Sequence, residues 1–235
     1  RIYERRRESG LDHLIGPMRA IVIQIETGNG RAYLEELHLM SPYVFVGAYL
    51  NKTHKIYILE SKPEYPRLIV LEPLSRDFVD TLTRLNALYP NGRRAPNARY
   101  VGEIYKVEDM ANAREILESH DIRFYDPGDT VNPFYTNPHL AFSWVSNYTG
   151  NRVGYIEKDF DDYDVLEFGD RLIINPDFVD QLKKMKDRAT RLGFDTLMLG
   201  VDHMATRMLA GEREDAMLEF MTMTNYHFWG AYNIT

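Results

Sequence analysis

The sequence has 235 residues, of which 44% are hydrophobic and 27% are charged, so it can bury the core of one large or two small domains. Its formal net charge of -7 argues against a nucleic-acid partner, because binding to phosphates needs a surplus of lysine and arginine. The chain contains no cysteine, which excludes disulfides, thiolate metal sites and cysteine nucleophiles. Any metal must therefore bind histidine, aspartate or glutamate.

No apolar run approaches the roughly 20 residues that cross a membrane, and no signal-peptide pattern opens the sequence. We therefore expect a cytoplasmic protein without a membrane partner. The sequence has no P-loop, no GxSxG elbow and no GxGxxG after a strand, which disfavours the common nucleotide-binding and hydrolase classes.

The first part of the chain predicts the order strand, helix, strand, strand, strand. β-Branched residues indicate the first strand, and apolar residues at helical spacing indicate the helix that follows it. The predicted elements are a strand over 18–26, a helix over 30–41, and strands that begin at Tyr43, His54 and Arg67.

The next part of the chain repeats this βαβββ order. It comprises a strand over 99–107, a helix over 109–120, and strands over 122–125, 140–148 and 152–159. Asp-Phe-Val-Asp occurs at 77–80 and again at 177–180, each time at the start of a helical pattern, and Asn175 with Pro176 is a good helix start. The repetition of both the motif and its surroundings predicts tandem modules.

A third module is expected to begin near residue 193, with a strand over 197–209, a helix over 212–223 and a strand from Tyr226. The predicted domains are a first module over 11–90, a second over 91–192 and an incomplete third over 193–235. The predicted fold is of the α+β class, with βαβββ modules forming a cupped mixed sheet.

Tandem βαβββ modules resemble the vicinal oxygen chelate superfamily, which includes glyoxalase I, the bleomycin-resistance proteins and the extradiol dioxygenases. The resemblance is most specific near the end, where "GVDHMATRM" and "EDAMLEFMTMTNYHFWGAYN" are similar to the opening of the catalytic half of 4-hydroxyphenylpyruvate dioxygenase. The matching positions are Asp202, His203, Phe228 and Trp229.

This resemblance implies a divalent metal, most naturally Fe(II), held by two histidines and one glutamate with open positions for an α-keto acid and dioxygen. His203 matches the first histidine, whereas the second histidine and the glutamate would lie beyond Thr235. Ala20, and Tyr100 or Val101, stand at the first-strand ligand positions of the earlier modules and do not suit iron, so those modules resemble a scaffold half.

Glu72 and Glu157 stand on the last strands of their modules, where glyoxalase-type sites place a glutamate. A glutamate among apolar neighbours is costly to bury unless it is paired or metal-bound, but strand alternation can also turn it toward water. Both glutamates are thus candidate metal ligands, with a salt-bridged or solvated glutamate as the alternative.

The long loop over 125–139 is a candidate pocket rim or a solvated connector, and His139 at its end is the histidine most worth testing there. With Tyr148 and Trp144 it forms a possible aromatic pocket, although aromatic residues on strands more often belong to the core.

Two functions remain open. The chain belongs to a metal-dependent dioxygenase or glyoxalase-like family that acts on a small aromatic or α-keto-acid compound, or it is a metal-free small-ligand-binding protein of the bleomycin-resistance type. A small molecule is the expected partner in either case, and a homodimer is compatible with both. The distinguishing feature is whether a second histidine and a glutamate converge on His203.

Overall fold

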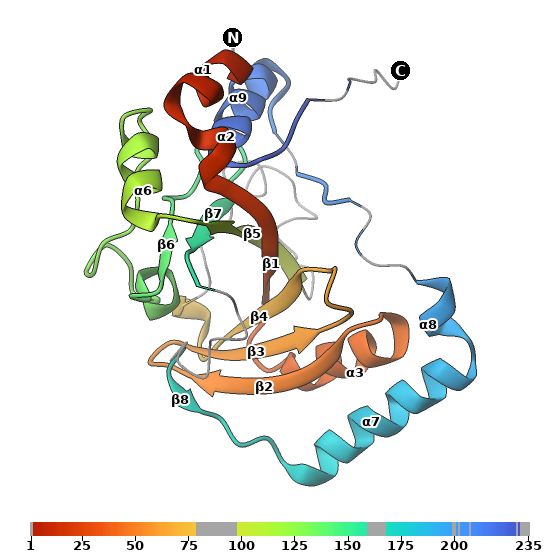
Figure 1. Ribbon diagram of the computed structural model, residues 1–235. Helices are drawn as coiled ribbons and strands as arrows, with labels where there is room; N and C mark the ends of the chain where they lie inside the picture. Colours follow the sequence, from red (N-terminus) through yellow and green to blue (C-terminus); the bar gives the residue numbers. More distant parts are fainter. Residues whose placement is uncertain are drawn as a thin grey trace.

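The computed structural model describes residues 2–78, 98–158, 168–198, 201, 203–206, 208–228 and 230. Within these residues one mixed sheet has the strand order β6-β7-β5-β1-β4-β3-β2-β8 (Figure 1). Two long strands, β1 (Ile15–Ile25) and β5 (Ala98–Val107), pair antiparallel at its centre. The α+β fold with a mixed sheet that was expected from the sequence is confirmed.

The first part of the sheet follows the predicted order. Strand β1 is followed by α3 (Gly30–Met40), β2 (Val44–Leu50), β3 (His54–Glu60) and β4 (Arg67–Pro73). β4 pairs parallel with β1, while β3 pairs antiparallel with β4 and with β2. Each predicted element of this part is present within a few residues of its expected bounds.

The next part repeats this order with shorter strands. Strand β5 is followed by α6 (Met110–Glu118), β6 (Leu140–Phe142) and β7 (Arg152–Ile156), and β5 pairs parallel with β7. The strand predicted over 122–125 is reduced to one bridge between Phe124 and Ser143. The strand predicted over 140–148 ends at Phe142, since Ser143 forms only the bridge to Phe124 and the residues from Trp144 to Tyr148 are not in a strand.

The remaining described elements are helices outside the sheet and the short edge strand β8, which pairs with β2. They are α1 (Ile2–Ser9), α2 (Leu11–Leu14), η1 (Arg76–Phe78), η2 (Pro133–Thr136), β8 (Asp170–Arg171), α7 (Pro176–Arg191), α8 (Phe194–Leu197), η4 (Ala210–Glu212) and α9 (Arg213–Met223). None of the described helices is long and apolar enough to cross a membrane.

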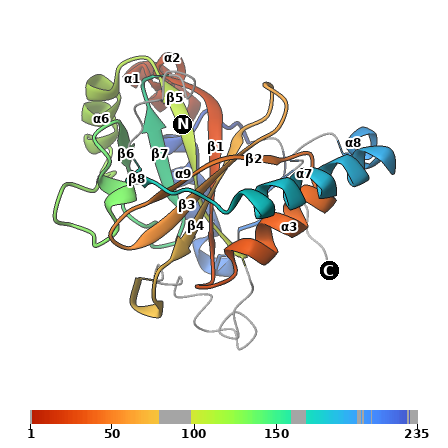
Figure 2. The ribbon, with the colours of Figure 1, turned by 90° about the horizontal axis from the view of Figure 1, so that it is seen from below.

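Helix α7 begins as the sequence predicts and runs alongside α3 (Figure 2). The Asn175 side chain accepts from the Asp177 N–H at 2.8 Å, which caps the helix. Arg31 on α3 donates to Gln181 on α7 at 2.8 Å and lies 4.7 Å from the Phe178 ring centroid. Of the first Asp-Phe-Val-Asp copy, only the start lies in η1, and the helix predicted after it falls outside the described residues.

The predicted strand over 197–209 is wrong at the positions that the structure describes. Helix α8 ends at Leu197, and the described residues from there to η4 are not in a strand. Figure 1 shows this segment as a long connection between α8 and α9. The apolar side chains Met204 and Met208 of this segment line a cavity beside β5. The apolar pattern that suggested a strand therefore reflects packing over the face of the sheet, where no strand edge is available for pairing.

The strand predicted from Tyr226 is also wrong for the described positions, since Tyr226–Phe228 are irregular. Tyr226 is held by a side chain from the other end of the chain: Arg6 on α1 donates to its carbonyl at 3.0 Å. The Arg6 residue is only 2% exposed, and its guanidinium also lies 3.0 Å from Asp12. Trp229 and Asp202 are outside the described residues.

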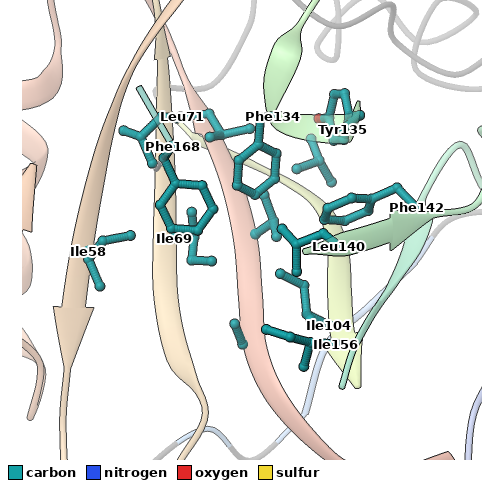
Figure 3. Packing of buried hydrophobic residues seen from close by; sticks show 14 residues of the cluster. Ile58, Ile69, Leu71, Ile104, Phe134, Tyr135, Leu140, Phe142, Ile156 and Phe168 are labelled. Atoms are coloured by element: carbon teal, nitrogen blue, oxygen red, sulfur yellow. The ribbon is translucent and has the colours of Figure 1, made fainter. Parts of the chain in front are cut away.

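The two faces of the sheet are filled differently. On one, which we call the helical face, α3 and α7 cover the first part of the sheet with Leu34 and Leu182, while α6 and α9 cover the second part with Leu117 and Met223. The opposite face, which we call the aromatic face, carries a cluster that includes Phe134, Tyr135, Phe142 and Phe168 (Figure 3). The aromatic face corresponds to the inside of the cup that the sequence predicts.

Candidate functional site

Glu72, the first candidate metal ligand, is buried in β4 and fully engaged in hydrogen bonds. Its carboxylate accepts from the Gly28 N–H at 2.7 Å and from the Tyr57 hydroxyl at 2.5 Å, and it lies 3.6 Å from Lys55 Nζ. A Cβ at Gly30 would lie 2.5 Å from the same carboxylate, which explains why glycine opens α3 here. These contacts give Glu72 a structural role at the start of α3, on the helical face.

The other two candidate ligands lie apart from Glu72. Glu157 directly follows β7 and is exposed, and its carbonyl accepts from Lys106 Nζ. His203 is exposed and lines a cavity that neither glutamate borders. No group of three His, Asp or Glu side chains among the described residues could hold a metal ion. The described part of the chain therefore does not fit a metal centre, and the three ligands stay predictions.

The inside of the predicted cup is closed by side chains. Phe134 and Tyr135 from η2 are each 1% exposed, and the Phe134 ring lies 5.3 Å from Phe142 and 5.4 Å from Phe168, centroid to centroid. The loop over 125–139 therefore supplies core residues to the aromatic face. This packing leaves the space that a substrate would need occupied by protein.

The predicted aromatic pocket of His139, Tyr148 and Trp144 is not gathered into one cavity. Trp144 is 44% exposed, stacks on Tyr125 at 5.9 Å and donates its indole N–H to the Phe124 carbonyl at 2.8 Å. It borders a polar hollow that neither His139 nor Tyr148 lines. The function of these three residues remains a prediction.

The structure instead places a cavity of about 540 Å³ on the helical face, beside β5 and beneath the segment that joins α8 to α9. Its volume falls in the range of small-molecule sites. The described residues that line it are mostly apolar or aromatic, with a few polar groups: Tyr100, Glu103, Thr149, Asn151, His203, Met204, Thr206, Met208, Ala216, Met217, Phe220 and Tyr226.

Glu103 is the buried acid of this cavity, with only 1% of its surface exposed. One carboxylate oxygen accepts from the Tyr100 hydroxyl at 2.6 Å, and the other accepts from the Tyr105 hydroxyl. Burial raises the pKa of Glu103 above its ordinary value, and the two tyrosine hydrogen bonds act in the opposite direction without cancelling it. A carboxyl with a raised pKa in an apolar cavity is a typical feature of functional sites.

A bulge in β5 brings Tyr100 and Glu103 to the same face although they are three residues apart. Val22 on β1 pairs with Gly102, but the next residue, Ile23, pairs with Tyr100, so Val101 is the extra residue. Val101 belongs to the cluster on the aromatic face, while Tyr100 and Glu103 line the cavity on the helical face. Without this shift, alternation along the strand would separate the hydroxyl from the carboxylate.

The tyrosines around Glu103 stay neutral. Burial is the main cause that raises the pKa of Tyr100 and Tyr105 well above the usual range, and the neighbouring Glu103 adds to it. The pKa of Tyr226 is raised for the same two reasons. At neutral pH these hydroxyls therefore act as hydrogen-bonding groups rather than as acids.

Contacts from several elements fix the wall opposite β5. The Tyr226 ring lies 5.4 Å from Phe220 on α9 and 6.1 Å from Tyr105 on β5. At the end of α9 the Met223 carbonyl accepts from the Tyr155 hydroxyl at 2.6 Å, and the Asn225 amide donates to the Gly16 carbonyl at 2.8 Å. The cavity is thus held by packed side chains on the α9 side.

The overlying segment is attached by a hydrogen bond at Thr206 and by the packing of Met204 against the cluster on the helical face. The Asn151 amide, from the turn before β7, donates to the Thr206 hydroxyl at 2.9 Å. Of the described residues before Met204, Leu197 and Val201 are 75% and 37% exposed.

Sequence reasoning missed Glu103, although a signal was present. The argument that singled out Glu72 and Glu157, an acid among apolar neighbours on a strand, applies equally to Glu103 in "RYVGEIYKV". The tyrosines at 100 and 105 were a second indication, because alternation places Tyr105 on the same face as Glu103. The bulge that adds Tyr100 has no clear sequence signature.

No protein-family model matches the sequence, and no curated protein gives a match. Among solved structures, methylmalonyl-CoA epimerase from Mycobacterium tuberculosis is similar with a TM-score of 0.44 at 13% identity, over 61% of this chain and 88% of the epimerase. A xylose isomerase-like TIM barrel/4-hydroxyphenylpyruvate dioxygenase fusion protein gives 0.41 at 9% identity, over 68% and 22% of the two chains.

A mutant of 4-hydroxymandelate synthase from Streptomyces coelicolor gives a TM-score of 0.38 at 12% identity, over 77% of this chain and 55% of the synthase. These neighbours include a fusion protein whose name contains 4-hydroxyphenylpyruvate dioxygenase. At such identities and TM-scores they are similarities of fold, and the function has to come from the site.

Proposed function

We propose that the described part of this chain is a metal-free small-ligand-binding protein of the vicinal oxygen chelate type. The observation that carries this proposal is the cavity over Glu103, which joins an apolar lining to one buried acid and its hydrogen-bonded tyrosines. An apolar pocket with a few convergent polar groups is the usual form of a small-molecule site. Its position on the helical face leaves the aromatic face to serve as core.

A metal-dependent dioxygenase or glyoxalase-like activity, with Fe(II) as the metal, has weaker support. No group of three His, Asp or Glu side chains in the described residues could hold the metal, and Glu72 already accepts hydrogen bonds from Gly28 and Tyr57. That function would require ligands supplied from elsewhere. The small aromatic or α-keto-acid substrate, the homodimer and the cytoplasmic location also remain predictions.

The proposal can be tested with N-phenyl-1-naphthylamine, a neutral apolar dye whose fluorescence rises on burial, after dialysis against EDTA. We expect saturable binding of one dye per chain. Met217→Glu places a charge in the cavity lining and should weaken binding by about tenfold or more, since an unpaired charge is costly to bury. Folding of each variant is checked by circular dichroism.

Leu218→Glu is the matched control, because Leu218 neighbours Met217 on α9, is 46% exposed and does not line the cavity. It should bind the dye as the unsubstituted chain does. The proposal fails if the EDTA-treated chain binds no dye saturably, if binding requires added metal, or if the two substitutions have equal effects.

A further inference from the structure

Resting on this proposed function, we infer that the cavity over Glu103 takes a small organic amine with a hydrocarbon or aromatic body. The buried carboxylate is the feature that selects for such a ligand. Both of its oxygens already accept hydrogen bonds from tyrosines. The carboxylate therefore has hydrogen-bond donors, and what a ligand can add is a positive charge. An ammonium group compensates the charge of a buried carboxylate.

The described lining residues suit an anion poorly. None of its described residues is lysine or arginine, and its ionisable groups besides the tyrosines are Glu103 and His203. A ligand carboxylate or phosphate would lie close to Glu103 and be repelled by it. The chain as a whole carries a formal net charge of -7, which also attracts cations rather than anions.

The polar groups suit an ammonium group in particular. An ammonium has three N–H donors and no acceptor, and the Tyr100 hydroxyl, which donates to Glu103 and lines the cavity, still has a lone pair to accept one of them. The rings of Tyr100, Tyr226 and Phe220 border the same space, and aromatic faces attract cations. The cavity thus combines a counter-charge, acceptors and aromatic faces.

The rest of the lining suits an apolar body. Met204, Met208 and Met217 lie along the cavity with Phe220, and methionine side chains adapt to ligands of irregular shape. A volume of about 540 Å³ accommodates an aromatic ring with a short alkyl chain. Because the carboxyl must be ionised to pair with the ammonium group, any proton that Glu103 holds passes to solvent on binding.

Three probes of nearly equal shape test the charge preference: 2-phenylethylamine, 2-phenylethanol and 3-phenylpropionate. Each competes against N-phenyl-1-naphthylamine at pH 7.5. We expect the amine to displace the dye at a concentration about tenfold or more below that of the alcohol, as is typical of a charge-assisted hydrogen bond, and the acid to be weakest.

Glu103→Gln removes the charge but keeps the shape, so the advantage of the amine over the alcohol should disappear while the dye still binds. Glu72→Gln is the control, because Glu72 is another buried carboxylate that accepts from a tyrosine, Tyr57, but does not line the cavity. The amine preference should survive in it.

Equal or tighter binding of the alcohol or the acid overturns the inference, as does an amine preference that survives in Glu103→Gln or is lost in Glu72→Gln. If the dye binds with these results, the proposed binding function stands and only the ligand class is wrong. If neither the dye nor any of the three probes binds, both the function and the ligand class are wrong.

Discussion

The Tyr100 hydroxyl donates a 2.6 Å hydrogen bond to the carboxylate of Glu103, three residues further along the same strand. Two side chains that far apart on a regular strand point to opposite faces, and the bulge at Val101 is what brings these together. Most of what we expect of this protein's chemistry follows from the placement of that carboxylate in an apolar cavity.

The stability of the chain is expected to depend on pH through Glu103. Its pKa is raised by burial, so the folded chain holds this proton more tightly than the unfolded chain does. Stability from this group is therefore complete below the ordinary carboxyl pKa and is lost as the pH rises through the raised value. Glu103→Gln removes this dependence and should lower stability at pH 8 by no more than about 1 kcal/mol.

Urea unfolding of the parent and Glu103→Gln between pH 4.5 and 8 measures this effect. The free energy of unfolding of the variant, minus that of the parent, should increase with pH. A difference that decreases with pH would mean that the folded chain prefers the ionised carboxylate, which contradicts the burial argument.

Affinity for 2-phenylethylamine should rise with pH, because the carboxyl must lose its proton to pair with the ammonium group. The groups that face Glu103 are Tyr100, Tyr105 and Tyr226, which stay neutral, and His203, which borders the same cavity. Competition titrations from pH 5 to 8 should show this slope in the parent and in His203→Gln, and a flat profile in Glu103→Gln. A slope that disappears with His203→Gln instead would assign the effect to the imidazole.

Phe134→Ala tests whether the aromatic face is core. We expect a loss of about 3–5 kcal/mol in the free energy of unfolding, since the ring is 1% exposed and its removal leaves a cavity among Tyr135, Phe142 and Phe168. Val131→Ala in the same loop, at a residue 71% exposed, should change stability by less than about 0.5 kcal/mol. A small effect of Phe134→Ala would indicate that this face is open to a substrate.

Gly154→Ala tests the close packing between β7 and Phe142. A Cβ at Gly154 would lie 2.6 Å from the Phe142 ring, so the substitution should cost about 1–3 kcal/mol in chemical denaturation. Gly47→Ala, on β2, meets no atom within 4 Å and should leave stability nearly unchanged. The penalty at Gly154 should shrink in a Phe142→Leu background, and an unchanged penalty there would place the strain elsewhere.

Metal titration separates the two functions considered. Anaerobic Fe(II), Mn(II) and Zn(II) titrations of the mass-verified chain should give no stoichiometric binding, because no described group of His, Asp or Glu could hold an ion. His203→Ala should behave identically. Stoichiometric binding that is lost in this variant would support the dioxygenase hypothesis and would mean that further ligands complete the site.

The sequence predicted the fold best where apolar residues recur at the spacing of a strand or helix and short connections join the elements. The order of β1, α3, β2, β3 and β4 and its partial repetition could be predicted, because each strand is rich in apolar residues and each turn is marked by Gly, Pro or Asn. The strand prediction over 197–209 was wrong at the described positions, because apolar alternation does not distinguish a strand from a chain segment that packs over the face of a sheet.

The site was less predictable than the fold. Glu72 was correctly singled out as a costly acid to bury, but its partners at Gly28 and Tyr57 depend on pairing across the sheet. The contribution of His203 to a cavity depends on the course of the segment after α8. Glu103 could have been found by the same argument, whereas the cavity around it is formed by residues from Tyr100 to Tyr226 that only the fold brings together.

The bond from Arg6 to the Tyr226 carbonyl ties the first helix to the wall of the cavity (Figure 1). Tyr226 in turn contacts Tyr105, which donates to Glu103. The opening residues therefore act as a brace for a site formed some hundred residues or more further along the chain. A fusion or cut within α1 alters the preorganisation of the cavity, so ligand affinity is best measured on chains whose first helix is left unmodified.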